Sequence, residues 1–155
     1  MKLFCASFTF DGSMPARYTG FGEDISPELN IEDIPEGTVS LAITLDDLDV
    51  PFLRALNHWV IWNIPAASVI PEALPHGDVI ETPVHACQGN AWGKHRYRGP
   101  KQPPFIKKEH RYCFTVYALD CVLGISTDSG KAALLKAMAG HILGEARLIG
   151  RYKPE

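Results

Sequence analysis

Residues 39–47 read Val-Ser-Leu-Ala-Ile-Thr-Leu-Asp-Asp, and this stretch has the pattern of a β-strand. Leu41, Ile43 and Leu45 alternate with smaller or polar residues, and a period of two is typical of a β-strand. Because alternate side chains share one face of a strand, Asp47 continues the face of the three aliphatic residues. The stretch therefore predicts a strand that carries a carboxylate where the core meets its C-terminal end.

Three further segments have the pattern of strands. Residues 59–64 are apolar except Asn63 and end at Pro65, which is typical of a strand buried on both faces. Residues 111–119 form another clear strand, and residues 142–152 alternate well enough to form a last one. The 12 prolines and 13 glycines spread along the chain favour many short strands joined by turns.

One helix is expected, over residues 130–139. Asp128 or Ser129 can cap its start, and Gly140 can end it. Its apolar face is expected to consist of three side chains: Leu134, Leu135 and Met138. The residues alone thus predict a mainly β single domain, residues 1–155, with one helix near the C-terminus.

Composition narrows the class of protein. A hydrophobic fraction of 46% and a charged fraction of 21% are ordinary for a globular chain. No apolar run approaches the roughly 20 residues that span a bilayer, so no integral membrane association is expected. Residues 1–8 have one basic residue and make a poor signal peptide. The four cysteines form no CxxC pair, and we interpret them as reduced thiols of a cytoplasmic protein.

Charge is distributed unevenly along the chain, whose net charge is −3. Thirteen of the 18 acidic residues lie in residues 11–81, and seven of the 15 Lys and Arg lie in residues 94–111. The basic segment is either a solvated loop or a rim that concentrates anions near a pocket. Trp92, Tyr97 and Phe105 interleave with it, but the acidic total and the lack of a nucleic-acid motif predict no nucleic-acid partner.

Two histidines and a tyrosine stand at the starts of apolar strands. His58 opens the second strand, and simple alternation places it on the face of Val60 and Trp62. His110 and Tyr112 share a face at the start of the third strand. We expect all three to converge at one end of a sheet, near the carboxylate that ends the first strand. Imidazole N–H and phenol O–H groups can donate hydrogen bonds to an anion there.

The acidic cluster also has a structural interpretation. Asp49 lies two residues beyond Asp47 and is expected to bond the backbone of the turn at Val50-Pro51. Turn formation alone could also account for Asp47. If Asp47 belongs to the site, it is a partly buried carboxylate that needs partners.

Six groups of short motifs occur in a fixed order along nearly the whole chain. They are Asp24-Ile25-Ser26-Pro27; Asp47-Leu48-Asp49-Val50-Pro51; His58-Trp59 with Asn63-Ile64-Pro65; Asn90 to Gly93 with Tyr97-Arg98-Gly99-Pro100; His110-Arg111-Tyr112 with Tyr117-Ala118-Leu119-Asp120; and Ala137 to Leu143 with Gly150-Arg151-Tyr152. This set resembles the phosphatidylethanolamine-binding protein family, in particular its short bacterial and archaeal Raf-kinase-inhibitor-like (YbhB/YbcL-type) members.

The resemblance implies both a fold and a site. The implied fold is an antiparallel β-sandwich with Greek-key connections and a few peripheral helices. The ligand-binding residues that it implies are Asp47, His58, Gly99, His110 and Tyr112. The backbone around Gly99 and Pro103-Pro104 should form the lip of the pocket. The implied ligands are small anions, such as phosphate, phosphoesters or carboxylates, held without a metal or another cofactor.

The sequence departs from the family pattern at three places. Leu48 replaces a usual proline, Arg96 replaces a usual glycine, and the segment 99–110 is about two residues longer, adding Lys107 and Lys108. These changes leave the implied pocket residues intact and affect the shape of the lip. The longer extensions of the eukaryotic kinase regulators are absent, so kinase inhibition and membrane-lipid binding are not transferred.

Two functions follow from these residues. The first is an anion-binding protein, not an enzyme, with a small anionic or phosphorylated ligand and a regulatory role that recognises phosphorylated ligands or proteins. The alternative is a hydrolase in which Asp47 orients His58 or His110 as a general base, although no Ser or Cys stands in a nucleophile motif. A zinc site of the same three residues has acceptable ligands but no spacing signature. A homodimer is compatible with the sequence.

Overall fold

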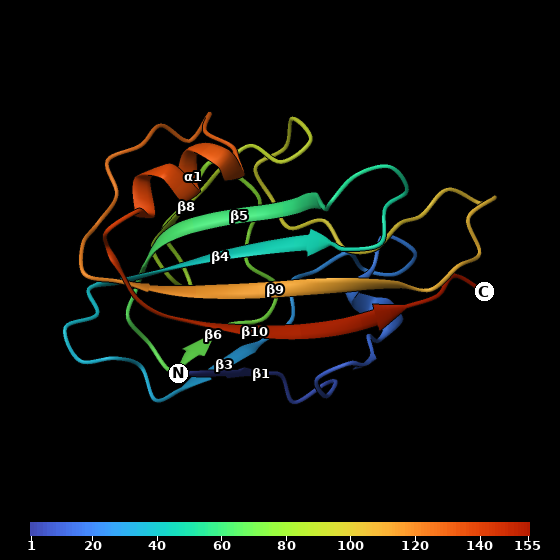
Figure 1. The fold of residues 1–155 in the computed structure, drawn as a ribbon, viewed down its shortest axis with the longest axis horizontal. Coiled ribbons are helices and arrows are strands. Elements are labelled where there is room, and N and C mark those ends of the chain that lie inside the picture. The colour runs from blue at the N-terminus through green and yellow to red at the C-terminus, as the bar shows by residue number, and fades with distance from the viewer.

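A computed structural model describes all residues, 1–155, and consists mainly of strands (Figure 1). The strands are β1 (Lys2–Phe4), β2 (Gly12–Ser13), β3 (Leu29–Glu32), β4 (Ser40–Asp47), β5 (Leu56–Pro65), β6 (Val69–Ile70), β7 (Val79–Ile80), β8 (Ala86–Gln88), β9 (His110–Leu119) and β10 (Ile142–Tyr152). One 3₁₀ helix (η1, Ala16–Tyr18) and one α-helix (α1, Lys131–Met138) complete the fold. None of the helices is both long and apolar enough to cross a membrane.

The strands form two sheets. The larger has the order β2-β10-β9-β4-β5-β8-β7, and the smaller has the order β1-β3-β6. All pairs are antiparallel except β2 with β10. β4 and β5 are consecutive neighbours, and the chain returns much later to place β9 on the other side of β4. The predicted β-sandwich with a helix near the C-terminus is therefore confirmed.

The central strands of the large sheet, β4, β5 and β9, are buried on both faces. On one face, Leu41, Ile43 and Leu45 share a core with residues of the small sheet such as Leu29 and Ile31. The opposite face carries a second core beneath α1, built from eight buried residues: Ala42, Val60, Trp62, Tyr117, Leu119, Leu123, Leu134 and Met138. Full burial of each large apolar side chain contributes about 1.5–3 kcal/mol. The prediction that residues 59–64 are buried on both faces is confirmed.

The strand predictions agree with the structure to within a few residues. The stretch 39–47 corresponds to β4 and the tail 142–152 to β10. The segment 111–119 begins one residue earlier in β9, and the segment 59–64 extends at both ends in β5. Alternation identified these strands because each presents an apolar face to a core.

The helix begins without the predicted side-chain cap. Gly130 is its N-cap residue, and neither the Asp128 nor the Ser129 side chain accepts a hydrogen bond from a backbone N–H of the first turn. Instead, Ser126 accepts hydrogen bonds from both of their backbone N–H groups, which uses them in the preceding turn. Gly140 follows the end of α1 with φ +81°, as predicted for a terminating glycine.

The apolar face of α1 is narrower than predicted. Leu134 and Met138 are fully buried, whereas Leu135 is 40% exposed. Residues four apart lie on the same side of a helix, and the residue next to Leu134 is rotated away by about 100°. Because α1 has only eight residues, two buried side chains suffice to seat it on the sheet.

Candidate functional site

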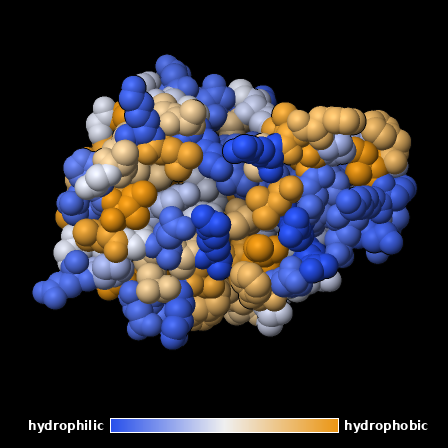
Figure 2. Space-filling model, viewed as in Figure 1, coloured by the Kyte–Doolittle hydropathy of each residue, from blue (hydrophilic) through white to orange (hydrophobic).

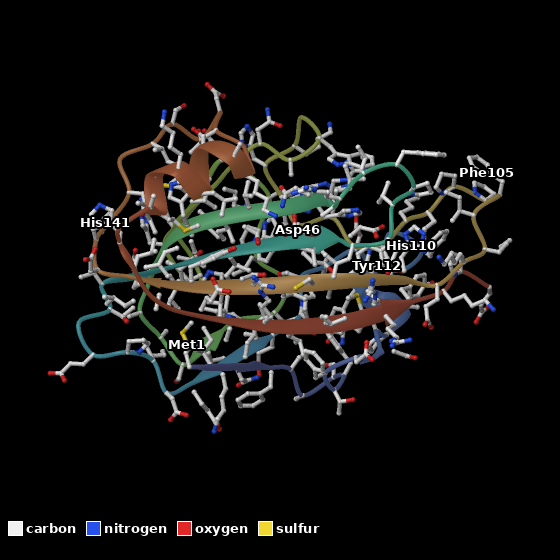
Figure 3. The ribbon with its side chains drawn as sticks, in the orientation of Figure 1. Met1, Asp46, Phe105, His110, Tyr112 and His141 are labelled. Carbon is white, nitrogen blue, oxygen red and sulfur yellow. The ribbon has the colours of Figure 1, made fainter.

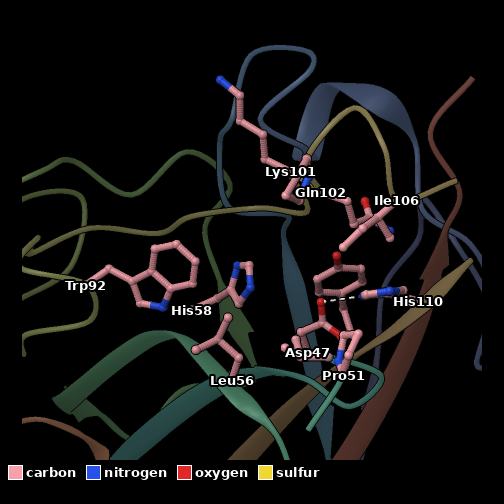
Figure 4. A pocket seen from close by; sticks show the side chains of 12 residues that line it. Asp47, Pro51, Leu56, His58, Trp92, Lys101, Gln102, Ile106 and His110 are labelled. Carbon is pink, nitrogen blue, oxygen red and sulfur yellow. Dashed lines mark hydrogen bonds and ion pairs between the residues drawn. The ribbon is translucent and has the colours of Figure 1, made fainter. Parts of the chain in front are cut away.

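Four of the predicted site residues surround one cavity at an end of the large sheet. In the antiparallel sheet, the C-terminal end of β4 lies beside the start of β9, and Asp47 pairs in register with Tyr112. His58 near the start of β5 and His110 at the start of β9 lie at the same end. The cavity has a volume of about 200 Å³ (Figure 4). It is lined by Asp47, Val50, Pro51, Leu56, His58, Trp92, Lys101, Gln102, Pro103, Ile106, His110 and Tyr112.

A bulge in β5 determines where His58 lies. Leu45 pairs with Trp59, but the next residue of β4, Asp46, pairs with Asn57, so His58 has no partner on β4. An extra residue of this kind leaves the ladder locally unpaired and interrupts the alternation of side chains. The face of His58 therefore does not follow from counting along the strand.

The bulge corrects one sequence-based prediction. Alternation places His58 on the face of Val60 and Trp62, which lie in the core beneath α1. In the structure, the His58 ring instead meets Tyr112 edge-on, with ring centroids 5.5 Å apart, and Tyr112 belongs to the core between the two sheets. The assigned face was wrong, although His58 does line the cavity with the other residues.

Asp47 and His110 form a buried hydrogen-bonded pair. The Nδ1 of His110 lies 2.8 Å from Oδ2 of Asp47, and the two side chains are 3% and 4% exposed. Because a carboxylate can only accept, Nδ1 carries the proton and Nε2 remains free of this bond. The other Asp47 oxygen accepts the backbone N–H of Asp49 at 2.9 Å. Asp47 thus has the partners that a buried carboxylate requires.

His58 is held in one tautomer by the backbone. Its Nδ1 lies 3.1 Å from the carbonyl oxygen of Arg98, which can only accept, so Nδ1 donates and Nε2 is left for other partners. Burial lowers the pKa of His58 below its ordinary value, against the opposing influence of the Arg98 carbonyl and the Asp47 charge. The lowered pKa favours the neutral imidazole in the free protein.

Tyr112 stays protonated in this setting. Burial, and then the negative charge of Asp47, raise the pKa of its hydroxyl well above its ordinary value. A phenol that does not ionise remains a hydrogen-bond donor at every physiological pH. Its ring lies between the two imidazoles, 5.5 Å from the His58 centroid and 6.5 Å from that of His110.

The turn after β4 is tied to β9. The Asp49 carboxylate accepts the backbone N–H of Arg111 at 2.8 Å and two guanidinium N–H groups at 2.9 Å, and this pairing lowers the pKa of Asp49. The prediction that Asp49 bonds the backbone at Val50-Pro51 is therefore wrong. Leu48 donates its N–H to the Arg111 carbonyl at 2.9 Å. A proline has no N–H for this bond, so Leu48 adds a tie that the usual proline lacks.

Gly99 is not among the residues that line the cavity. Its N–H donates to Asp24 at 2.7 Å, and Asp24 also pairs with Arg96 at 3.4 Å. A Cβ at Gly99 would lie only 2.0 Å from the carbonyl oxygen of Tyr18. This glycine therefore allows the backbone of the lip to pack closely, while Pro103 supplies the lip's contact with the cavity.

The basic side chains of the segment 94–111 lie in different places relative to the cavity. Of its seven Lys and Arg side chains, only Lys101 lines the cavity. The Arg98 guanidinium lies over the Trp92 ring, 4.3 Å from its centroid, and Trp92 forms part of the cavity wall. Tyr97 is buried in the core. A separate polar hollow is lined by His76, Gly77, Gly93, Lys94, His95 and Arg96.

Sequence reasoning missed several lining residues in the long loop before β9. Gln102 is 6% exposed and donates from Nε2 to the Lys108 carbonyl at 3.3 Å, while its Oε1 has no hydrogen-bond partner. Ile106 also contributes to the wall. Neither residue belongs to a periodic segment, so the sequence offered no signal for their position.

The cavity contains few groups suited to covalent chemistry. Its lining includes no Ser, Thr or Cys. Cys113 borders a hollow on the other face of the sheet, with Asp46 and Lys131. The possible metal-ligating atoms of Asp47, His58 and His110 do not all lie within 4.8 Å of one another. The three residues whose ligating atoms lie this close together are at another place in the fold.

Comparison with known proteins identifies the family. A family model described as phosphatidylethanolamine-binding protein matches residues 6–153. The chain belongs to the phosphatidylethanolamine-binding protein family. Within this family, the chain is 43% identical over 155 residues to a UPF0098 protein of Methanothermobacter thermautotrophicus, with 99% of each chain covered. It is 42% identical over 147 residues to a UPF0098 protein of Pyrococcus abyssi, which covers 94% of this chain and 82% of that one.

Solved structures of phosphatidylethanolamine-binding protein homologues share the fold. The crystal structure of such a homologue from Chlamydia trachomatis superimposes with a TM-score of 0.85 at 32% identity, covering 99% of this chain and 97% of that one. YbcL of E. coli, described as a member of the mammalian family, gives a TM-score of 0.86 at 25% identity over 99% and 98% of the two chains. The resemblance inferred from the motifs is confirmed.

Proposed function

We propose that the cavity binds the anionic group of a small ligand, namely a phosphate, a phosphoester or a carboxylate. The observation that carries this proposal is the buried His110–Asp47 pair in the wall of a cavity that Tyr112 and His58 also line. The Tyr112 phenol offers an O–H donor, and the Nε2 of each imidazole donates to an anion when the ring is protonated. Hydrogen bonds to an ionised group are about twice as strong as neutral ones.

The carboxylate of Asp47 has a supporting role in this proposal. A carboxylate beside an anion is repulsive, but its bond to Nδ1 holds the His110 ring in place. Nε2, the other ring nitrogen, is then left for the ligand. Lys101 at the cavity supplies a positive charge, and it forms no salt bridge with a carboxylate.

The walls of the cavity favour a ligand with an apolar part. Apolar residues also line the cavity: Val50, Pro51, Leu56, Trp92, Pro103 and Ile106. Around them, Phe52, Leu53 and Phe105 are exposed, and an apolar surface is visible at this end of the molecule (Figure 2). A phosphomonoester or carboxylate with a short alkyl or aryl group would bury both parts, so it should bind more tightly than the bare ion.

A regulatory role would use the same contacts. A phosphorylated small molecule and a phosphorylated side chain on a protein present the same dianionic group to the donors. The apolar rim would then contact the rest of the ligand. Homodimer formation and recognition of phosphorylated proteins are further parts of this proposal that binding experiments can test separately.

Titration calorimetry with a matched set of ligands tests the proposal. Inorganic phosphate, propyl phosphate, butyrate and the uncharged propanol should be compared at constant pH and ionic strength. We expect the charged ligands to bind, propyl phosphate to bind more tightly than phosphate, and propanol to show no binding. Equal heats for propyl phosphate and propanol would show that the cavity selects apolar groups rather than anions.

The hydrolase alternative is measured with the same protein. Asp47 and His110 have the geometry of a base held by a carboxylate, and such a pair can activate water. p-Nitrophenyl phosphate and p-nitrophenyl acetate should therefore be incubated with the wild type and with His110→Ala. Turnover that disappears in the variant would favour catalysis, whereas binding of propyl phosphate without turnover supports the binding function.

A further inference from the structure

A second group of chemically reactive side chains lies at the opposite end of the large sheet from the cavity. Asp120 and Cys121 follow the end of β9, and His141 precedes the start of β10. Figure 3 shows His141 at one end of the molecule and His110 with Tyr112 at the other. The carboxylate, thiol and imidazole each offer a ligating atom, and these three atoms lie within 4.8 Å of one another.

The backbone already holds these residues together. The Asp120 N–H donates to the carbonyl of His141 at 3.1 Å, and the His141 N–H donates to the carbonyl of Met138 at 2.9 Å. The Cys121 carbonyl accepts the hydroxyl of Ser40 at 2.5 Å. The segments are therefore tied to one another, to β4 through Ser40 and to α1 through Met138.

The ligand types match a borderline divalent cation. Zn²⁺ binds Cys sulfur at about 2.3 Å and His nitrogen or carboxylate oxygen at about 2.0–2.2 Å, usually with four ligands in a tetrahedron. Ligands at these distances lie about 3.3–3.8 Å from one another. The ligating atoms are now at most 4.8 Å apart, and the Asp120 and His141 atoms, at 2.8 Å, would separate slightly to admit the ion. Asp120 and His141 are 44% and 47% exposed, which leaves room for a water molecule as the fourth ligand.

We propose that Asp120, Cys121 and His141 form a binding site for Zn²⁺ or a similar divalent cation. The thiol releases its proton to solvent as the sulfur–metal bond forms. Nδ1 of His141 now lies 2.8 Å from Oδ1 of Asp120. On binding, the Nδ1 proton passes to solvent and Nε2 carries the ring proton, so a neutral imidazole and the Asp120 carboxylate both ligate the metal. The site joins the end of β9 to the start of β10. It does not depend on the anion-binding function, because none of its residues lines the cavity.

The thiol separates this cluster from an ordinary surface pair. His85 and Glu81 form such a pair at 3.1 Å, also exposed, and no cysteine accompanies them in a group of metal ligands. Cys87, in turn, is a half-buried free cysteine outside any such group. His85 and Cys87 thus provide matched controls for His141 and Cys121.

Titration of the full chain with Co²⁺ and Zn²⁺ tests the proposal. The wild type should bind one equivalent of Co²⁺ with a thiolate-to-metal charge-transfer band in the near ultraviolet, and Zn²⁺ should displace it. Cys121→Ser should abolish the band, and Asp120→Asn and His141→Asn should each weaken Zn²⁺ binding at least tenfold. Cys87→Ser and His85→Asn should bind within about twofold of the wild type.

Thermal unfolding gives a second measurement on the same variants. Zn²⁺ should raise the Tm of the wild type and of the controls, because a ligand that binds only the folded chain stabilises it. It should leave the Tm of Cys121→Ser unchanged. His110→Ala should still bind Zn²⁺, which distinguishes this site from the cavity. A charge-transfer band that persists in Cys121→Ser, or equal Zn²⁺ affinity in all variants, would overturn the proposal, and His141→Asn decides the matter if Cys121→Ser does not fold.

Discussion

Asp47 and His110 are 63 residues apart in sequence, yet their side chains meet at 2.8 Å with almost no exposure to solvent. Both side chains are shielded from water, and each provides the hydrogen-bond partner that the other needs. Such pairs are interdependent, because the loss of one partner leaves a buried charge or donor without compensation. The arrangement therefore links the stability of the fold to the chemistry of the cavity.

A double-mutant cycle should reveal this coupling. We expect His110→Ala and Asp47→Asn each to lower the free energy of unfolding by about 1–3 kcal/mol, and the double variant to lose less than the sum. Urea unfolding of the four proteins measures the coupling. The same cycle on the exposed pair His85 and Glu81 is the control and should show no measurable coupling. Strict additivity at Asp47 and His110 would contradict the paired arrangement.

The anion affinity of His110→Ala is a separate prediction of the proposed function. Loss of one hydrogen bond to a charged group should cost about 1.5–3 kcal/mol, which corresponds to roughly a tenfold to hundredfold weaker dissociation constant for propyl phosphate. His85→Ala should bind with unchanged affinity. Calorimetry distinguishes the two outcomes, provided that circular dichroism shows both variants folded.

His58 predicts a pH dependence with a definite sign. Burial lowers the pKa of His58 in the folded protein below the unfolded value of about 6.5. Below pH 6.5 the unfolded chain therefore binds more protons at this position than the folded chain. The free energy of unfolding should fall as the pH decreases from about 6.5 through the folded pKa of His58. His58→Asn keeps an N–H for the Arg98 carbonyl, cannot titrate, and should lose this part of the pH dependence.

Anion binding should reverse the shift at His58. A bound anion favours imidazolium, so it should raise the pKa of His58, and affinity should consequently increase as the pH falls. NMR titration of the His58 ring with and without sulfate, which does not titrate in this range, measures both pKa values. An identical titration curve with saturating sulfate would show that protonation of His58 has no part in recognition.

Two buried tyrosines should separate binding from stability. Tyr112→Phe keeps the buried ring and removes the hydroxyl at the cavity, so anion affinity should fall by roughly tenfold, the worth of about one hydrogen bond, with little change in unfolding. Tyr97→Phe removes a bond of 2.7 Å to the Tyr18 carbonyl, which is buried. It should lower the free energy of unfolding by about 1–2 kcal/mol and leave affinity unchanged. The opposite pattern would remove Tyr112 from the site.

The long strands were predictable because each carries its burial pattern locally. Leu41, Ile43 and Leu45 alternate along β4, and the same period places Asp47 at the end of the core face. Convergence of the site also followed from sequence, since strand ends meet at one edge of a sheet. The family motifs added Gly99, whose role in the structure is close packing of the lip backbone.

Other features depend on pairings that no local pattern encodes. The bulge at His58 arises from the register of β5 against β4, and it reverses the face that alternation assigns. Asp49 bonds Arg111 across 62 residues, although its position favours a local turn. Asp120 and His141 meet only because β9 and β10 pair as neighbours. In each case the deciding contact is distant in sequence.

Gly99→Ala should be among the most damaging small substitutions in the chain. The added Cβ would lie 2.0 Å from the Tyr18 carbonyl oxygen and 2.8 Å from Cα of Thr19, and both are backbone atoms that cannot rotate away. Overpacking of this kind costs about 1–3 kcal/mol or more. A shift of the backbone at Gly99 would also move the neighbouring Arg98 carbonyl, which accepts the hydrogen bond from His58. Anion affinity should therefore decrease together with stability.

Gly124→Ala is the matched control for this prediction. A Cβ at Gly124 meets nothing within 4 Å, and its backbone does not adopt a positive φ, so alanine should be neutral or slightly stabilising, by about 0.4–1 kcal/mol through the unfolded chain. Urea unfolding and propyl phosphate titration of both variants provide the measurements. Because alanine restricts the unfolded chain equally at the two positions, the difference between the variants isolates the clash at Gly99. Equal stabilities would mean that the backbone at Gly99 can move away from Tyr18 at no cost. A rigid Arg98 carbonyl could then not be the reason for the orientation of His58.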